Sequence, residues 1–162
     1  MSLLLLRRHY PELLSNVGFE TPGGGGADVF LNWSESAGDG AVARTTTAGE
    51  FRSGVAACKI TTGPTYNTFI QQNFAVVPGV SYTLNFWSRG DGTNTGRYNV
   101  YDITNSQAII SLTSTNVPGT TYALVSRTFQ APAGCILAQI QFVCTSGAGG
   151  IGYFDDVSCK RK

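Results

Sequence analysis

Three acidic residues near the two ends of the chain have the types and spacing to do chemistry: Glu20, Asp155 and Asp156. Paired carboxylates can act as general acid and base in glycoside hydrolysis, but they must then lie about 5 to 10 Å apart across a cleft. Neighbouring residues of a β-strand point to opposite faces, so Asp155 and Asp156 cannot form such a pair. If the first and last strands lie side by side, Glu20 and one of the aspartates instead meet at the edge of one core. They then need a cation, because unpaired buried charge is very costly.

The other reactive side chains show no catalytic or zinc-binding pattern. The single histidine, His9, lies near the N-terminus, so a serine or cysteine nucleophile has no evident neighbouring base. The four cysteines, Cys58, Cys135, Cys144 and Cys159, lack the C-x-x-C spacing of a zinc site. A straight strand would hold Cys135 and Cys144 too far apart for a disulfide, whereas a Cys58–Cys159 bond is possible. The alternative is four small buried thiols. We expect a protein that is not an enzyme.

Short β-strands separated by turns must position these residues. A length of 162 residues, 20 glycines and only 13% charged residues suit one all-β domain. No segment of ten or more residues has helical periodicity. We therefore predict a two-sheet antiparallel β-sandwich of the jelly-roll type. Residues 23–26 are expected to form a flexible loop and residues 30–33 a short strand or turn. The other expected strands span residues 54–61, 69–77, 81–89, 97–103, 108–113, 122–130, 136–144 and 151–158.

The chain is expected to divide into an N-terminal arm (1–12), the sandwich domain (13–159) and a basic tail (160–162). Apolar and basic residues of the arm could dock the domain onto a larger assembly; these are Leu3, Leu4, Leu5, Leu6, Arg7 and Arg8. The alternative is a disordered leader. The four-leucine run is too short for a signal peptide, and the basic residues follow it. We expect display on a virion or other extracellular particle, or otherwise cytoplasmic synthesis with release outside the Sec route.

Scattered basic residues and a net charge of +1 predict no nucleic-acid partner, and the lack of any apolar run of 18 or more residues predicts no membrane partner. Strand alternation instead predicts an outward set rich in amides and aromatic rings. A solvated sheet face usually carries Lys, Glu and Thr, whereas sugars favour aromatic rings beneath their C–H faces and amides or Arg for their hydroxyls. We expect this set to bind a glycan, although a neighbouring subunit of a homo-oligomer or a loop could cover it. The set is Gln71, Asn73, Asn85, Trp87, Arg97, Asn99, Tyr101, Gln139 and Gln141.

Several segments, in order, resemble the calcium-stabilised jelly-roll carbohydrate-binding modules attached to xylanases and glucanases, which are galactose-binding-like β-sandwiches. The likeness covers roughly residues 13 to 159. It rests on residues 13–20 (LLSNVGFE), Trp33, residues 53–61 (SGVAACKIT), residues 72–91 (QNFAVVPGVSYTLNFWSRGD), residues 125–134 and residues 152–158 (GYFDDVS).

This resemblance implies a structural Ca²⁺ near the joined termini. Its ligands would be the carbonyl of Gly18, the carboxylates of Glu20 and Asp155, and a further carbonyl from residues 50–54. The alternative is that Glu20 and Asp155 pair with Arg52 or Lys59. The resemblance also places the ligand on the concave sheet, with Trp33 either in a loop at its rim or in the core.

These observations favour a non-catalytic module that binds a polysaccharide or cell-surface glycan and is displayed on a larger assembly through its arm. The alternative is a purely structural virion component, such as a capsid decoration, fibre or tail-attached protein. That protein would contact capsid or tail proteins and bind no glycan. Neither an attached catalytic domain nor an export signal, both usual for a secreted polysaccharidase, is evident in the sequence.

Overall fold

The computed structural model describes residues 10–65, 67–144 and 149–162. The arm residues expected to mediate assembly, Leu3, Leu4, Leu5, Leu6, Arg7 and Arg8, lie outside the described residues. The structure therefore addresses the sandwich and its surface.

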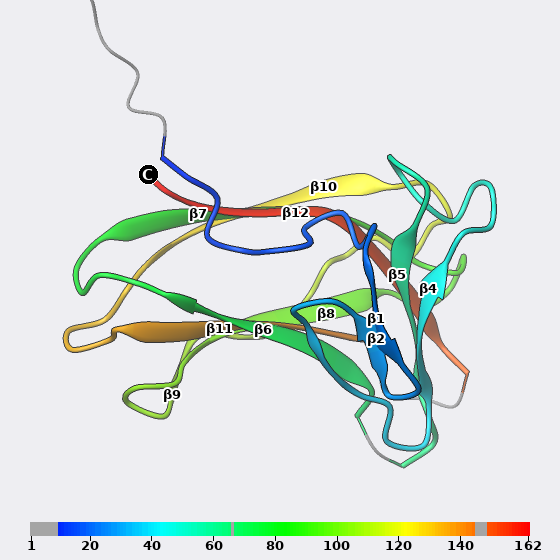
Figure 1. Ribbon diagram of the computed structural model, residues 1–162, viewed down its shortest axis with the longest axis horizontal. Helices are drawn as coiled ribbons and strands as arrows, with labels where there is room; N and C mark the ends of the chain where they lie inside the picture. The colour runs from blue at the N-terminus through cyan, green and yellow to red at the C-terminus, as the bar shows by residue number, and fades with distance from the viewer. Residues whose placement is uncertain (1–9, 66, 145–148) are drawn as a thin grey trace, which may run out of the picture.

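Two five-stranded sheets lie one above the other in two layers, and all strand pairs within them are antiparallel (Figure 1). Sheet I has the order β10-β7-β12-β5-β4, sheet II has the order β3-β6-β11-β8-β9, and β1 and β2 form a separate hairpin. The strands are β1 (Pro22–Gly25), β2 (Asp28–Phe30), β3 (Ser34–Ser36), β4 (Ala41–Thr45), β5 (Ala57–Thr61), β6 (Phe69–Ala75), β7 (Ser81–Arg89), β8 (Gly96–Asp102), β9 (Gln107–Ser114), β10 (Ala123–Gln130), β11 (Leu137–Cys144) and β12 (Ile151–Arg161). The predicted all-β sandwich is confirmed. No helix among the described residues is long and apolar enough to cross a membrane.

Aromatic side chains from both sheets meet in the core. Phe86 of sheet I lies 4.9 Å from Phe142 of sheet II, measured between ring centres, and Phe142 lies 4.6 Å from Phe154. Trp33 is 5% exposed and packs against Phe19 at 5.1 Å, so it belongs to the core rather than to the rim. Large aromatic side chains dominate core energetics because each buries about 150 to 250 Å².

The glycine-rich segment that was expected to be a loop is a strand. Pro22–Gly25 pairs with β2 through a turn at Gly26 and Ala27, and Gly25 (φ 95°) and Gly26 (φ 64°) both have positive φ. Glycine adopts such positive φ values at no steric cost, so the residues that hide the alternating pattern also permit the hairpin. Ala41–Thr45, which the sequence reading missed, forms the edge strand β4 of sheet I.

Two chain positions also differ from the expectation. Lys160 and Arg161 are not part of a free tail, because they continue β12 opposite Thr83 and Tyr82 of β7. Ile136, the first residue of the expected strand 136–144, instead precedes β11 and is 62% exposed.

All four cysteines are buried, and no disulfide joins any two of them among the described residues. The possible Cys58–Cys159 disulfide is therefore absent, and the alternative of small buried thiols is confirmed. Burial raises the pKa of the Cys159 thiol to about 12, so this side chain behaves as a small apolar group.

Candidate functional site

The two ends of the domain lie side by side, as the acidic residues suggested. The Leu13 N–H donates to the Cys159 carbonyl at 3.0 Å, and the Val157 N–H donates to the Val17 carbonyl at 2.8 Å. This pairing brings Glu20 and Asp155 to the same segment, residues 52–55, which precedes β5.

Asp155 holds this segment onto sheet I. Its side chain is fully buried, and its Oδ2 accepts hydrogen bonds from the N–H groups of Arg52 at 2.8 Å and Ser53 at 3.3 Å. Its Oδ1 accepts from the Asp156 N–H at 2.8 Å. Burial raises the pKa of Asp155 to about 6, although the three donors oppose this shift. Asp155 is thus the buried residue of the acidic pair, and Asp156 is its partly exposed neighbour. The expectation that the two point to opposite faces is wrong, because Asp156 (φ 47°) interrupts the alternation of β12 and both carboxylates contact Arg52 and Ser53.

Glu20 contacts the same segment from the other side. Both of its carboxylate oxygens lie 3.1 Å from the Val55 nitrogen. Gly54 (φ 64°) passes so close that a Cβ there would overlap Glu20 Oε1. Arg44 donates to the carbonyls of Phe19 at 3.2 Å and Glu20 at 2.9 Å. Residues 52–55, Glu20 and Asp155 are referred to below as the clasp.

The clasp agrees only partly with a calcium site. Glu20 and Asp155 reach one segment, as the resemblance requires, and Gly18 lies beside Glu20. However, backbone N–H groups occupy both carboxylates, and no group of three or more His, Cys, Asp or Glu side chains in the described ranges is arranged to hold a metal ion. Calcium stays a prediction. The alternative pairing is wrong in detail, because Arg52 pairs with Asp156 and Lys59 with Glu50.

Most of the predicted glycan-binding set gathers on the outer face of sheet II. Strand register places Gln71, Gln141 and Asn99 in one row across β6, β11 and β8. The next row holds Asn73, Gln139 and Tyr101, and Arg97 lies on the other side of the first row. All of these side chains are partly or fully exposed. They are referred to below as the amide face: Gln71, Asn73, Arg97, Asn99, Tyr101, Gln139 and Gln141.

Two predicted residues lie elsewhere. Asn85 and Trp87 belong to β7, so they lie on the outer face of sheet I. The expectation of one shared face is wrong because alternation gives the direction of a side chain from its own strand but not the sheet to which that strand belongs. Trp87 lies in register with Leu124 and Asp155, and the guanidinium carbon of Arg52 lies 3.9 Å from its ring centre. A ligand contact by Asn85 or Trp87 stays a prediction.

Hydrogen bonds join the side chains of the amide face. The Asn99 amide donates to Gln141 at 3.4 Å, and the Gln141 amide donates to Gln71 at 3.3 Å. Gln139 donates to Asn73 at 2.8 Å. The carbonyl oxygen of Asn99 is enclosed and accepts no hydrogen bond. The face therefore has one unsatisfied acceptor beside a row of fixed amides.

The sequence reading missed one aromatic residue of this face. Phe69 is partly exposed and lies in a row with Val143 and Arg97, one row from Gln71. Alternation along β6 places Phe69 on the same side as Gln71 and Asn73, so this signal was present in the sequence.

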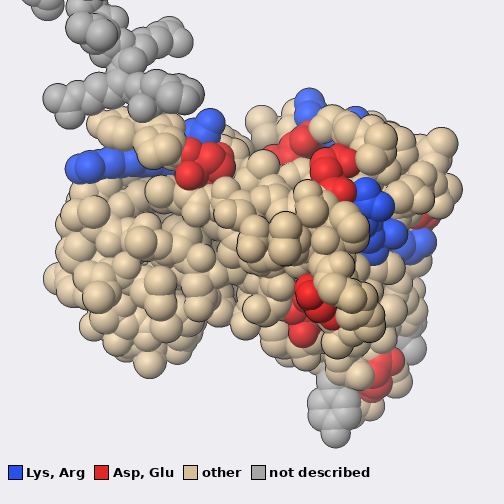
Figure 2. All heavy atoms as spheres, viewed as in Figure 1, with Lys and Arg blue, Asp and Glu red and all other residues tan. Residues whose placement is uncertain are grey.

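The amide face is an open surface. No pocket is found among the described residues. Arg97 is the only charged side chain that register places on the described part of this face, and its guanidinium donates to the Leu112 carbonyl at 3.3 Å. Figure 2 shows that charged side chains gather around β1 to β5 and near the described termini, whereas the part around β9 and the turn before β11 is uncharged. A ligand of the amide face must therefore bind on an exposed, weakly charged surface.

Residues 11–143 match a family model described as a carbohydrate binding domain, CBM_4_9. No curated protein sequence matches the chain.

Solved structures share the fold. TmCBM61 in complex with β-1,4-galactotriose aligns with 94% of this chain and 99% of its own, at 18% identity and a TM-score of 0.70. The CBM22-1 xylan-binding domain of Paenibacillus barcinonensis Xyn10C aligns with 94% of this chain and 95% of its own, at 13% identity and a TM-score of 0.66. The enzymatically active domain of bacteriophage CBA120 tailspike protein 4 aligns with 93% of this chain and 21% of its own, at 19% identity and a TM-score of 0.66.

Proposed function

Because the chain belongs to the CBM_4_9 carbohydrate-binding domain family, we propose that it binds a polysaccharide through the amide face and does not catalyse its cleavage. The observation that carries this proposal is the row of Gln71, Gln141 and Asn99, whose amides are held by one another on an exposed sheet. Each amide side chain has one oxygen acceptor and two N–H donors, so this row retains donors for sugar hydroxyls.

The unsatisfied Asn99 carbonyl supports a ligand with hydroxyl donors. A buried acceptor without a partner costs about 1 to 3 kcal/mol. A sugar hydroxyl that donates to Asn99 would recover this energy. A purely apolar ligand would not.

Aromatic rings lie on both sides of the amide row. Tyr101 is in the row beyond Gln141, on β8, and Phe69 is in the opposite row, on β6. Neighbouring strands lie about 4.8 Å apart and alternate residues of a strand about 7 Å apart, so these rings lie on a diagonal of the face. A sugar chain that crosses this diagonal places C–H groups against the rings and hydroxyls against the amides. Because the surface is open, a polymer uses more of it than a single sugar.

The positions of the acidic residues support binding rather than cleavage. Glycoside hydrolysis uses two carboxylates that flank the scissile bond. Asp155 is buried beneath the clasp, and Asp156 is paired with Arg52. Neither side chain faces the amide face, because β12 belongs to sheet I.

The purely structural virion role has less support. It depends on the arm, and the arm residues expected to mediate assembly lie outside the described residues. Family membership favours a glycan ligand instead.

Affinity electrophoresis in gels that contain soluble xylan, β-1,4-galactan or β-glucan tests the proposal. We expect at least one polymer to slow the wild-type protein and Tyr101→Ala to weaken this binding about tenfold, the cost of about 1.4 kcal/mol for a lost aromatic contact. Thr128→Ala, on the exposed outer side of β10, is the control and should migrate like the wild type. Equal retardation of the wild type and Tyr101→Ala would contradict the proposal, as would no retardation by any polymer.

A further inference from the structure

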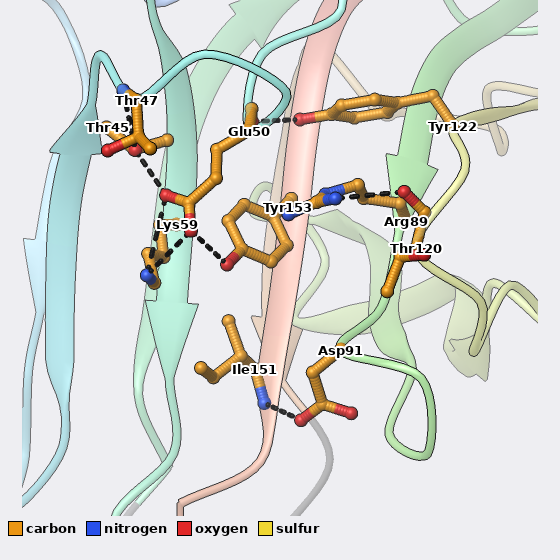
Figure 3. A network of polar contacts seen from close by, with 10 residues as sticks. All are labelled: Thr45, Thr47, Glu50, Lys59, Arg89, Asp91, Thr120, Tyr122, Ile151 and Tyr153. Carbon is orange, nitrogen blue, oxygen red and sulfur yellow. Dashed lines mark hydrogen bonds and ion pairs between the residues drawn. The ribbon is translucent and has the colours of Figure 1, made fainter.

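Arg89 has an unusual environment on the other sheet. Of the described lysines and arginines only Arg89 is buried, with 9% of its surface exposed. Its guanidinium carbon lies 4.1 Å from the ring centre of Tyr153 and 5.8 Å from that of Tyr122. Its Nη1 donates to the Thr120 carbonyl at 2.9 Å (Figure 3).

No carboxylate pairs with Arg89 in the part of the chain that the structure describes. The nearby Glu50 carboxylate is occupied by Lys59, Thr45 and the Tyr153 hydroxyl. Asp91 accepts instead from the N–H groups of Thr93, Asn94 and Ile151. The Nε atom of Arg89 is enclosed and makes no hydrogen bond. Buried charges are normally paired, because burying one alone is costly.

We propose that Arg89, Tyr153 and Tyr122 form a second binding site, on the outer face of sheet I, for the carboxylate of an acidic sugar. The site shares no residue with the amide face and lies on the other sheet. The two proposed sites can therefore be tested independently.

The free atoms of the guanidinium favour a carboxylate. Because Thr120 binds Nη1, the edge formed by Nε and Nη2 is left without a protein partner. A carboxylate can accept two parallel hydrogen bonds from such an edge. The Tyr153 ring fixes the plane of the guanidinium, so the edge is held in one direction.

The neighbouring side chains favour a sugar acid over a bare anion. The partly exposed Tyr122 supplies an aromatic ring for the C–H groups of a pyranose attached to the carboxylate, whereas the buried Tyr153 ring holds the guanidinium. Lys59 Nζ lies 5.4 Å from the Tyr153 ring centre and adds a second positive charge. Lys59 is on β5 and Arg89 on β7, the two strands that flank β12, which carries Tyr153.

Segments outside the strands border the site. The Tyr122 hydroxyl donates to the Glu50 carbonyl at 2.9 Å, joining the segment after β4 to the segment before β10 (Figure 3). Because the Nε edge is enclosed, the proposed site requires these segments to move apart locally when the ligand binds.

The test follows the side-chain Nε–H signal of Arg89 by ¹H–¹⁵N NMR, assigned by its loss in Arg89→Lys. Glucuronate and galacturonate are titrated into the wild type, with glucose, galactose, acetate and sulfate as comparison ligands. We expect a saturable shift with at least one uronate and at least tenfold weaker binding of the neutral sugars and of acetate and sulfate. Arg89→Lys, followed by backbone signals, should bind the uronate at least tenfold more weakly because it lacks the two-donor edge. Arg127→Lys, an exposed arginine of sheet I, should bind like the wild type.

If Arg89→Lys does not fold, the Arg89 Nε–H signal can be assigned in the wild type by correlation with the backbone signals of Arg89, so the wild-type titration still decides the proposal. An unshifted Arg89 signal, or equal affinity for uronate and neutral sugar, would overturn the site. Equal binding of acetate or sulfate would overturn its assignment to a sugar acid. Unchanged uronate affinity in folded Arg89→Lys would also overturn it. None of these results bears on retardation by neutral polysaccharides, which tests the amide face separately.

Discussion

The outer face of sheet II presents its polar side chains in open rows, whereas the outer face of sheet I is bordered by the clasp and by the segments that carry Glu50 and Tyr122. On sheet II the amides bond mainly to one another, and the Asn99 carbonyl lacks a partner. On sheet I, Asp155, Tyr153 and Tyr122 each bond to the segment between β4 and β5.

The outward residues of the two sheets therefore differ in what they bond to. Outward residues that form hydrogen bonds with a loop of their own chain stabilise the fold, because these bonds are present only when the loop is folded against the sheet. Outward residues that bond only to neighbours on the same face keep donors and acceptors for a ligand. We therefore expect ligand binding at the amide face and stabilisation of the fold at the clasp.

The largest effect is expected at the clasp. Asp155→Ala removes the acceptor for the N–H groups of Arg52, Ser53 and Asp156, and should lower the free energy of unfolding by about 3 kcal/mol. Urea denaturation measures this loss. Asp156→Asn is the matched control, because a partly exposed ion pair contributes at most about 1 kcal/mol.

The pH dependence of the same measurement provides a check. The folded pKa of Asp155, about 6, lies above the ordinary value of 3.8, so the folded protein binds more protons between these pH values. This contribution to stability is present below about pH 4 and is lost as pH rises towards 6, by up to about 1.4 kcal/mol per pH unit. Asp155→Ala should lose this slope. An identical slope in the variant would contradict the assignment to Asp155.

Calcium at the clasp predicts the next largest effect. If Gly18, Glu20 and Asp155 hold Ca²⁺, removal of a saturating ion costs about 2.7 kcal/mol at one hundred times its dissociation constant. Excess EDTA should then lower Tm by about 5 to 10 °C, and Asp155→Asn should abolish the response. Identical melting curves in EDTA and in calcium would contradict the prediction that the clasp binds Ca²⁺.

Substitution of Trp87 tests whether the outer face of sheet I stabilises the fold or binds the polysaccharide. Trp87→Ala should cost about 2 kcal/mol, because the half-buried ring packs beneath Arg52, but should leave neutral polysaccharide binding unchanged. Leu124→Ala, the exposed residue in register with it, should change stability by less than about 0.5 kcal/mol. Loss of polysaccharide binding in folded Trp87→Ala would instead favour the ligand role predicted from sequence.

The smallest expected effect comes from a matched pair of asparagines. Asn99→Ala removes an amide from the centre of the amide face and should weaken polysaccharide binding about tenfold, as one lost hydrogen bond of about 1.4 kcal/mol would. Asn85→Ala makes the same change on sheet I and should leave affinity unchanged. Isothermal titration calorimetry compares the two, and equal losses would remove the distinction between the faces.

Much of the fold could be predicted from the sequence because strand signals are local. The pattern of residues 81–89 predicted β7 with its observed bounds, and its alternate residues Tyr82, Leu84 and Phe86 are buried. The hairpin at Pro22–Gly25 could not be recognised in this way, because glycines have no side chains to alternate. The sheet to which a strand belongs depends on distant partners, so Trp87 and Tyr101 were assigned to one face when they lie on two.

The candidate site was predictable to a similar extent. The amides and Tyr101 were found because their types differ from an ordinary solvated face, and Phe69 was overlooked although its spacing from Gln71 is the same as that of Asn73. The contact of residues 52–55 with Asp155 and Trp87 could not be predicted, because it depends on how a loop folds back over its own sheet. The unpaired guanidinium of Arg89 also appears only in three dimensions.

One ¹H–¹⁵N spectrum reports on both faces and tests the central claim most directly. The chain has two tryptophans, so the indole signal of Trp87 can be assigned with Trp87→Ala and followed beside the side-chain amides of Gln71, Asn99 and Gln141. During titration with an oligosaccharide of the polymer that is bound, the account predicts saturable shifts of these amides with an unchanged Trp87 indole. A shifted indole with unchanged amides would place the ligand on sheet I and contradict it.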